Sequence, residues 1–306
     1  MVSFRAYAKI NLGLLILEKR PDGYHNIETV FHRVGLFDEI SLDPSPGIIV
    51  ESSSPDAPDD ERNICFKTVK LLQEHLGIRA GVKISIQKNI PVGAGLGGGS
   101  SDAAAVLLRL PTFWGRAVGQ KELSSLALQL GSDVPYFLKS GSAHARGRGE
   151  ILDFFALDVP YTILLCSPGV HVSTAWAYRQ VSPRKRPVDL ASLVLKGMKN
   201  PKDLHEIGND FESTVLDAFP VVRNAKNAMI DNGAVFSLMS GSGSTVFGLF
   251  DNHEVAHQAS NALEAVGFQT HLTPPHFQPV EPDVCENAPR AQEPGHLRCE
   301  PPGPSG

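Results

Sequence analysis

Hydrophobic and polar positions along the first half of the chain predict strands and helices in mixed order. Residues 4–17 are almost continuously apolar, interrupted by Lys9 and Asn11, and predict one or two strands. Clean alternation over residues 82–88 predicts a half-buried strand. The other elements that we expect in this half are a strand over residues 28–42 and helices over residues 64–76, 101–110 and 121–130.

The pattern changes near residue 156, where we place a domain boundary. Beyond it, residues 161–168 predict a new strand, and two apolar strands flank a tight glycine turn at residues 240–245. We therefore expect an α+β fold of two domains with a cleft between them, residues 1–156 and 157–272. Residues 273–306 hold nine of the 23 prolines. They cannot bury enough apolar surface to offset the entropy of ordering, so we expect a disordered tail.

Composition and charge narrow the class of protein. Hydrophobic residues make up 42% of the chain, and the formal net charge of -5 leaves no basic footprint, so we expect no nucleic-acid partner. No apolar stretch approaches the ~18 residues of a membrane span. Arg5, Lys9 and Asn11 interrupt the first apolar stretch, where a signal peptide needs an unbroken one. The four cysteines show no CxxC spacing, so we expect free thiols and a cytoplasmic location.

The strongest chemical signal is a glycine-rich loop between the strand of residues 82–88 and the helix that follows. Five of its positions are glycine, which lets backbone N–H groups turn toward one point without obstruction. Ser100 or Ser101 can cap the helix, whose positive dipole end then faces the same point. We predict that the loop binds polyphosphate. Its residues are Pro91, Val92, Gly93, Ala94, Gly95, Leu96, Gly97, Gly98, Gly99, Ser100 and Ser101.

A dinucleotide fingerprint, a Walker A loop and a flexible linker all fit this glycine-rich loop poorly. The spacing of Gly93, Gly95 and Gly98 matches the fingerprint, but residues 88–91 separate it from its strand and residues 111–122 predict no second strand. A Walker A loop requires a lysine after the glycines, and none follows. A linker is disfavoured because a strand and an alanine-rich helix frame the loop.

Lys9 and Asp133 are ambiguous from the residues alone. Asp133 can cap a helix that has Pro135 in its first turn, or it can aim a carboxylate at a neighbouring loop. Lys9 can face solvent on the alternate side of its strand. A lysine beside an aspartate would instead hold the carboxylate ionised and lower the pKa of a substrate hydroxyl, as general-base chemistry needs.

The segment His253–His257 matches the HExxH pattern of zinc proteases, but helix geometry argues against a metal there. At about 100° per residue, the apolar side chains from Val255 to Val266 cluster on one helix face. Both histidines fall on the opposite, solvent-facing side, so we expect no catalytic zinc.

Three blocks together resemble the GHMP kinases, a family of galacto-, homoserine, mevalonate and phosphomevalonate kinases. The blocks are AYAKINLGLLILEKRPDGYHNIETVF (6–31), PVGAGLGGGSSDAA (91–104) and SGSGSTVFGLF (240–250), and the likeness covers about residues 3–272 in order. It implies a two-domain α+β kinase in which ATP and substrate meet in the interdomain cleft. It also implies that Lys9 and Asp133 are the catalytic pair, with Asp133 accepting the hydroxyl proton and Lys9 stabilising charge.

The resemblance assigns further residues to ATP and to the substrate. The glycine-rich loop would wrap the ATP phosphates, and Asn63 would lie near the purine. Asn11 would help to position the substrate. The first block is closest to family members that phosphorylate the 2-hydroxyl of a CDP-linked methylerythritol, which makes that compound the expected substrate. The implied cytidine pocket consists of Tyr24, His25, Phe31 and Tyr178.

Further expectations concern Mg²⁺, the alternative functions and the oligomeric state. Mg²⁺ is expected to accompany ATP, but the sequence identifies no carboxylate ligand, and only Ser100 or Ser101 suggests a hydroxyl for it. A mevalonate or homoserine kinase and a catalytically silent nucleotide-binding module are the alternatives. The presence of both Lys9 and Asp133 argues against the silent module. We expect a monomer or a homodimer.

Overall fold

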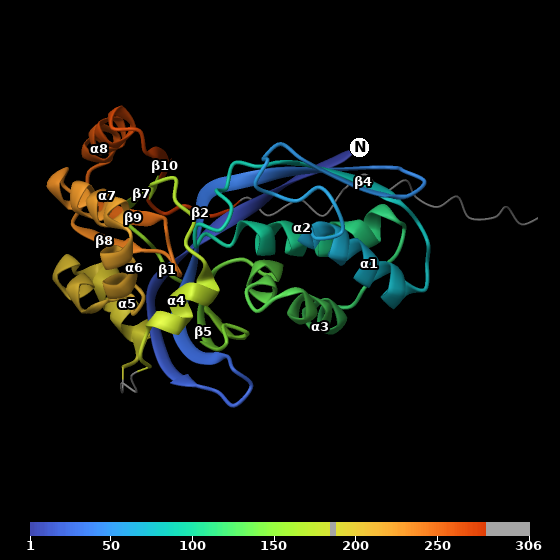
Figure 1. Cartoon of the computed structure of the whole chain (residues 1–306), viewed down its shortest axis with the longest axis horizontal. Coiled ribbons are helices and arrows are strands. Elements are labelled where there is room, and N and C mark those ends of the chain that lie inside the picture. Colours follow the sequence, from blue (N-terminus) through green and yellow to red (C-terminus); the bar gives the residue numbers. More distant parts are fainter. Residues whose placement is uncertain (184–187, 280–306) are drawn as a thin grey trace, which may run out of the picture.

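A computed structural model describes residues 1–183 and 188–279, which form two β-sheets with helices packed against them. The predicted α+β class is therefore confirmed (Figure 1). The first sheet has six strands, β1 (Val2–Lys19), β2 (His25–Asp43), β3 (Ile48–Ser52), β4 (Val82–Gln87), β5 (Ser142–Gly147) and β6 (Ile151–Phe155). Its order is β3-β4-β2-β5-β6, and β1 pairs along the length of β2. Strands β3 and β4 are parallel, and the other neighbours are antiparallel.

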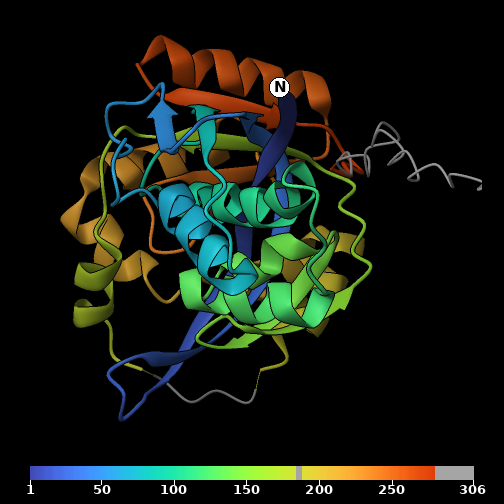
Figure 2. The ribbon, with the colours of Figure 1, turned by 90° about the vertical axis from the view of Figure 1, so that its right-hand side faces the viewer.

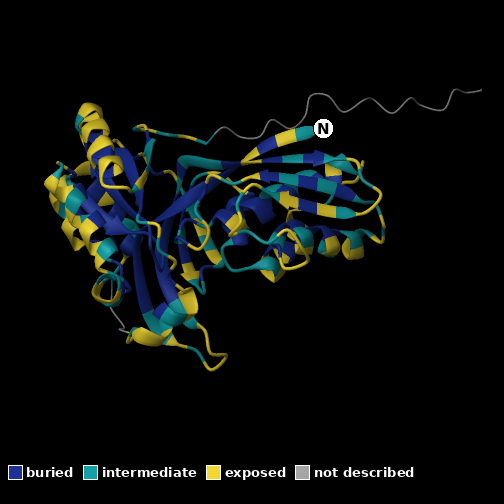
Figure 3. Cartoon of the chain, turned by 45° about the horizontal axis from the view of Figure 1, so that its top comes forward, coloured by how far each residue is buried: buried dark blue, intermediate teal, exposed yellow. Residues whose placement is uncertain are grey.

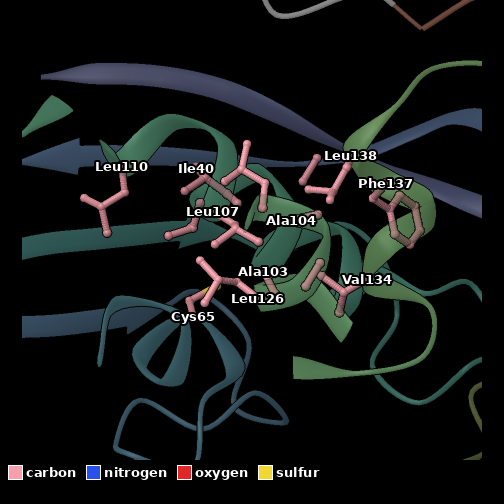
Figure 4. Close-up of a cluster of buried hydrophobic side chains, with 14 of the residues drawn as sticks. Ile40, Cys65, Ala103, Ala104, Leu107, Leu110, Leu126, Val134, Phe137 and Leu138 are labelled. Carbon is pink, nitrogen blue, oxygen red and sulfur yellow. The ribbon is translucent and has the colours of Figure 1, made fainter. Parts of the chain in front are cut away.

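Four helical segments cover one face of the first sheet (Figure 1). They are α1 (Ile64–Leu76), α2 (Gly98–Phe113), α3 (Gln120–Leu130) and the 3₁₀ helix η1 (Val134–Leu138). Apolar side chains from α2, including Leu107 and Leu110, meet Ile40 of β2 and Leu126 of α3 in a shared core (Figure 4). Strand β4 alternates buried and less buried residues as its sequence predicts, because only one face of the sheet carries helices (Figure 3).

The second sheet has four antiparallel strands in the order β10-β7-β9-β8. Its strands are β7 (Thr162–Ser167), β8 (Phe236–Met239), β9 (Val246–Phe250) and β10 (Gln269–Thr273). The surrounding helices are α4 (Thr174–Gln180), α5 (Leu190–Lys199), η2 (Pro201–Glu206), α6 (Glu212–Ala218), α7 (Pro220–Asp231) and α8 (His253–Ala265). The predicted glycine turn joins β8 to β9.

Strand β1 belongs to the first sheet and also packs against the second. Ile10 and Leu12 share a hydrophobic cluster with Ile163 and Leu165 of β7. The hairpin of β1 and β2 ends in a turn at residues 20–24, which projects from the rest of the chain (Figure 2). The two sheets therefore meet along β1, which is where the predicted catalytic lysine lies.

One local detail differs from the sequence prediction, namely the start of α2. The helix begins at Gly98, its N-cap is Gly97, and no side chain caps it, so the predicted cap by Ser100 or Ser101 is wrong. Both serines lie inside the helix, where Ser101 Oγ donates to the carbonyl of Tyr7 at 2.7 Å.

The limits of the two sheets can be compared with the predicted domain limits. The first sheet ends at Phe155 and the second begins at Thr162, while the division at residue 156 stays a prediction. The predicted disorder from residue 273 is wrong for its first part, because Thr273 pairs with Ile163 and the Phe277 ring lies 5.8 Å from that of Tyr7. The rest of the predicted tail, 280–306, lies outside the described residues. Within the part of the chain that the structure describes, no helix is long and apolar enough to cross a membrane.

Candidate active site

A cavity of about 480 Å³ lies where the glycine-rich loop, β1, η1 and α4 approach one another. Most of the residues predicted for the site line it: Lys9, Asn11, Phe31, Asn63, Pro91, Val92, Gly93, Ala94, Gly95, Gly97, Gly98, Gly99, Ser100, Asp133 and Tyr178. Four predicted residues do not line it: Tyr24, His25, Leu96 and Ser101. The structure thus brings together segments that are far apart in the chain, and the chemical roles of these residues stay predictions.

The glycine-rich loop has the backbone geometry that its composition predicts. Gly93, Gly95 and Gly97 all have positive φ angles, which side chains rarely tolerate. The first backbone bond of α2 runs from Ser101 N–H to Gly97 C=O at 2.9 Å, so the N–H groups of Gly98 and the next two residues precede it. Such donors at a helix N-terminus, together with the helix dipole, favour an anion.

The second glycine turn holds the first loop in place. A Cβ atom at Gly95 would lie 2.1 Å from the carbonyl oxygen of Ser240, so glycine is required there for packing as well as for φ. The Ser240 hydroxyl donates to the Gly95 carbonyl at 2.9 Å, and Thr245 N–H donates to the Ala94 carbonyl at 3.1 Å. The turn is therefore more than a hairpin connection, because it fixes the backbone of the loop.

Lys9 is buried, contrary to the solvent-facing alternative. Its side chain is 5% exposed, and Nζ lies 3.8 Å from Asp133 Oδ2. Nζ also donates to Asn11 Oδ1 at 2.6 Å and to the Gly95 carbonyl at 3.1 Å. Burial lowers the pKa of Lys9, and the negative charge of Asp133 opposes this shift. A buried cation thus joins the carboxylate to the glycine-rich loop.

Irregular pairing within β1 explains why two polar side chains face inward there. The register with β2 shifts between Tyr7 and Lys9 and again between Asn11 and Leu14. Bulges of this kind redirect side chains, and Lys9 and Asn11, two residues apart, share one face of the strand. Asn11 Nδ2 donates to Thr29 Oγ1 at 2.8 Å, so both ends of the amide already have partners.

Asp133 occupies the N-cap position of η1 but makes no capping hydrogen bond with its side chain. The capping interpretation is therefore right about position and wrong about the bond. The carboxylate is about one third exposed and faces both Lys9 and the cavity. The carboxylate is therefore open to a ligand in the cavity.

The base of the loop holds a buried ionic cluster that the sequence analysis missed. Lys88 Nζ lies 2.5 Å from Asp38 Oδ2 and 2.8 Å from Asp102 Oδ2, and all three side chains are nearly inaccessible. Asp38 Oδ1 also accepts from the backbone N–H groups of Asn89 and Ile90, which lead into the loop. The sequence signal for this cluster is Asp102, a charged residue within an alanine-rich helix.

Asp102 differs from the other members of this cluster. Its Oδ1 is buried without a hydrogen-bond partner among the described residues, and Asp102 lines the cavity together with Lys88. Burial raises the pKa of Asp102 to about 7, and the nearby charge of Lys88 opposes the shift. The cavity wall therefore contains an acceptor that the described part of the chain leaves unsatisfied.

Aromatic rings gather around the part of the cavity that Tyr178 and Phe211 line, which we call its aromatic end. The rings of His25 and Tyr178 are stacked with centroids 4.9 Å apart, and Tyr178 meets Phe211 edge-on at 4.9 Å. Burial raises the pKa of Tyr178 to about 12. Phe31 is fully buried and packs on Tyr136.

Tyr24 is the chain neighbour of His25. It is 54% exposed, in agreement with its place in the turn between β1 and β2. The guanidinium of Arg148, a residue that the sequence analysis did not single out, lies 4.8 Å from its ring centroid. The ring is therefore accessible to a ligand and stands beside a positive charge.

The HExxH segment has no metal-binding geometry. His253 Nδ1 lies 3.2 Å from Thr162 Oγ1, and the Nε2 atoms of His253 and His257 are 3.1 Å apart. Among residues 1–183 and 188–279, no group of three His, Cys, Asp or Glu side chains could hold a metal ion. Both histidines are exposed, as the helix geometry predicts.

Comparison with known proteins relates the chain to an enzyme family. A family model described as the GHMP kinases N terminal domain matches residues 63–141, and one described as GHMP kinases C terminal matches residues 192–269. The 4-diphosphocytidyl-2-C-methyl-D-erythritol kinase of Prosthecochloris aestuarii is 45% identical over 282 residues, which cover 90% of this chain and 98% of that protein. The enzyme of the same name from Chlorobium limicola is 44% identical over 287 residues, covering 91% and 99%.

Solved structures agree with these relatives. A crystal structure of 4-(cytidine 5'-diphospho)-2C-methyl-D-erythritol kinase superposes with a TM-score of 0.76 at 34% identity and covers 89% of this chain and 98% of its own. A homoserine kinase from Cytophaga hutchinsonii superposes with a TM-score of 0.65 at 21% identity, covering 90% and 95%. The second likeness shows the shared fold alone.

Proposed function

Since the chain belongs to the GHMP kinase family, we propose that it transfers the γ-phosphate of ATP to the 2-hydroxyl of 4-(cytidine 5'-diphospho)-2-C-methyl-D-erythritol. This reaction is a step of the non-mevalonate route to isoprenoid precursors. The observation that carries the proposal is the position of the Lys9–Asp133 pair beside the glycine-rich loop, in one cavity. A phosphate donor and a hydroxyl acceptor can therefore be held next to the same carboxylate.

The chain's own residues suffice to describe the proton and charge transfers. Asp133 Oδ2 takes the proton of the 2-hydroxyl as its oxygen attacks the γ-phosphorus in line. The bond from that phosphorus to the bridging oxygen of ADP breaks, and ADP leaves with the electron pair. Lys9 Nζ, which is 3.8 Å from Asp133, stabilises negative charge on the oxygens in transit. In such transfers positioning and electrostatics supply most of the rate enhancement.

The nucleotide would lie along the loop and the start of α2. The N–H groups of Gly98, Gly99 and Ser100 would meet phosphate oxygens, and the purine would lie toward Asn63. Asn63 is buried, and its amide is engaged by Cys65 N–H and the carbonyl of Pro58. Asn63 would therefore contribute to the purine site through the shape that it gives to the cavity wall.

Mg²⁺ is expected with ATP and would bind mainly to the nucleotide. Mg²⁺ at phosphoryl-transfer sites commonly keeps several waters and takes one or two carboxylates besides the phosphates. The described chain offers no three-residue metal cluster, but two carboxylates, Asp102 and Asp133, line the cavity, and this fits such a mode of binding. The bound ion would neutralise phosphate charge.

The substrate assignment rests on relatives and on the aromatic end of the cavity. The two relatives at 44–45% identity carry the name of a kinase for the cytidine-linked compound. The stacked pair His25 and Tyr178 offers ring faces and polar ring atoms to a pyrimidine, with exposed Tyr24 nearby. We further propose a cytoplasmic location, since Cys65 and Cys166 are free and buried thiols.

A substrate panel tests the proposal. ADP release should be measured by a coupled assay with the CDP-linked methylerythritol, with free methylerythritol, with mevalonate and with homoserine. We expect turnover with the CDP-linked compound and a product whose new phosphate is on the 2-oxygen by ³¹P NMR. Preference for mevalonate or homoserine would identify a different GHMP kinase, and ATP binding without turnover of any of them would indicate the silent module.

A further inference from the structure

We propose that Arg148 binds the diphosphate of the CDP-linked substrate and thereby determines that this kinase prefers a nucleotide-linked polyol to a free one. The inference rests on the proposed function, because it assigns the link between the two ends of the same substrate. No sequence motif singles out Arg148, and the structure places it in the cavity wall.

Position is the first argument. Arg148 lies in the turn between β5 and β6, next to Gly149, and a Cβ atom at Gly149 would lie 3.5 Å from Asp133 Oδ1 and 3.7 Å from the Phe31 ring. On its other side, the Arg148 guanidinium lies 4.8 Å from the ring centroid of Tyr24. Since Gly149 approaches the proposed general base and the Arg148 guanidinium approaches Tyr24, this turn spans from the proposed general base to the proposed cytidine pocket. In the substrate, the diphosphate occupies the same place between the reacting polyol and the cytidine.

Charge is the second argument. Among the described residues, the basic side chains that line the cavity are Lys9, Arg62, Lys88 and Arg148. Lys9 and Lys88 are buried against Asp133 and against the Asp38–Asp102 pair, and Arg62 forms an exposed ion pair with Asp60. Arg148 is the basic residue at the aromatic end, and its guanidinium is suited to two phosphate oxygens at once.

The existing partner of Arg148 leaves most of the guanidinium available. Its ion pair, as far as the described residues go, joins Nε to Glu150 Oε1 at 3.7 Å, beyond ordinary hydrogen-bond length. Glu150 Oε2 also accepts from the Arg148 backbone N–H at 2.5 Å, which holds the turn. The side chain is 27% exposed, so it is accessible from the cavity. Glu150 thus orients the arginine and leaves its terminal amino groups to a ligand.

The test compares ligands that differ only in the diphosphate. Cytidine and cytidine 5'-diphosphate should be titrated into the full chain by calorimetry without ATP, for the wild type, Arg148→Gln, Arg148→Lys and the control Arg146→Gln. Arg146 lies in the neighbouring strand β5, but it is exposed and paired with Asp153 outside the cavity. Melting temperatures of all four proteins verify that they are folded.

We expect Arg148→Gln to weaken binding of the diphosphate by about ten- to a hundredfold, the usual contribution of a hydrogen bond to a charged group, and to leave cytidine binding unchanged. The affinity of Arg148→Lys for the diphosphate should fall between those of the wild type and Arg148→Gln. The affinity of Arg146→Gln should match that of the wild type. The KM for the CDP-linked substrate should rise while that for ATP stays constant.

Three results would overturn the assignment. Unchanged affinity for the diphosphate would exclude contact with it, and equal losses for cytidine and its diphosphate would make Arg148 a support for Tyr24. In a parallel titration with ADP, a loss of affinity for ADP instead would place Arg148 at the site of the other nucleotide. If the wild type bound neither cytidine nor its diphosphate, the cytidine assignment of the proposed function would itself be wrong.

Discussion

Lys9 donates a hydrogen bond to the carbonyl of Gly95 at 3.1 Å, so the cation that faces Asp133 is also bonded to the glycine-rich loop. The carbonyl is shared, because the Ser240 hydroxyl donates to it as well at 2.9 Å. One backbone oxygen therefore links the strand of the lysine, the loop and the second glycine turn. A substitution at Lys9 or Gly95 should therefore affect catalysis in the cavity before it affects other parts of the protein.

Asp133→Asn separates catalysis from capping. Because the Asp133 side chain makes no capping bond, the substitution should not disturb η1, and any fall in the melting temperature should come from the loss of the charge that faces buried Lys9. An amide cannot accept the hydroxyl proton, so kcat should fall by about 10²–10⁴ while ATP still binds. Turnover and melting should be measured on one preparation. Near-normal turnover would remove Asp133 from the mechanism.

Lys9 should set an alkaline limit on activity. Its pKa is lowered by burial, so Lys9 loses its charge at a lower pH than an exposed lysine, whose pKa is about 10.4. The plot of kcat against pH should therefore decline before that value, with circular dichroism showing the fold intact. Lys9→Met should abolish most turnover and the alkaline decline together.

The double variant of Lys9→Met and Asp133→Asn provides a further control. If the two groups act as one unit, the double variant should lose far less turnover than the product of the losses in the two single variants. Fully multiplicative losses would indicate that the pair does not work jointly.

Gly99→Val tests the phosphate assignment without straining the loop. A Cβ atom at Gly99 would meet only Ile64 Cγ2 at 3.7 Å, whereas one at Gly97 would lie 3.1 Å from Lys9 Cε in a positive-φ backbone. The added side chain should obstruct phosphate approach and weaken ATP binding by at least about tenfold, a loss of about 1.4 kcal/mol. Gly47→Val, at an exposed glycine with open space, is the matched control. Wild-type ATP affinity by calorimetry in Gly99→Val would exclude the loop from phosphate binding.

Tyr24→Ala addresses cytidine recognition. Tyr24 is exposed, so its removal should cost little stability. If a pyrimidine stacks on it, about 1–3 kcal/mol of binding is lost, and the KM for the cytidine-linked substrate should rise while that for ATP does not. Tyr24→Phe keeps the ring and should behave like the wild type. Equal increases in both KM values would limit Tyr24 to a supporting role.

Asp102 should make stability depend on pH. Its pKa of about 7 in the folded chain exceeds that of an ordinary aspartate, so the folded state binds the proton more tightly than the unfolded state does. The free energy of unfolding should therefore fall as pH rises from about 4 to about 7. Urea unfolding at several pH values should show this fall in the wild type and a flatter curve in Asp102→Asn, with exposed Asp59→Asn as the control. A slope that survives in Asp102→Asn would assign it to other groups.

Local patterns predicted local structure well and buried charges poorly. The helix of residues 64–76 follows from apolar spacing, and its end follows from Gly77, whose φ of 63° is the left-handed cap that glycine favours. The loop was recognisable because five glycines have few other uses between a strand and a helix. Its cap was mispredicted because Gly97, without a side chain, fills the N-cap position.

The ionic cluster shows what pattern alone cannot provide. Asp38, Lys88 and Asp102 each look like an ordinary charge in an alternating strand or on a helix face. They are buried because tertiary packing brings them together, and no local rule states which distant charge will be the partner. The roles of Lys9 and Asp133 were equally ambiguous from the residues alone. Only the resemblance of the sequence to a family indicated that the two form a pair.

The bond from Ser240 to Gly95 spans 145 positions of the chain, and this has a consequence for synthesis on the ribosome. Chains emerge N-terminal end first, so the first sheet and its helices are complete long before the second glycine turn exists. Until then the loop lacks the hydroxyl and the N–H group that fix its carbonyls. A nascent chain should therefore acquire its affinity for nucleotide only near the end of translation, when the turn that supports the loop has left the ribosome.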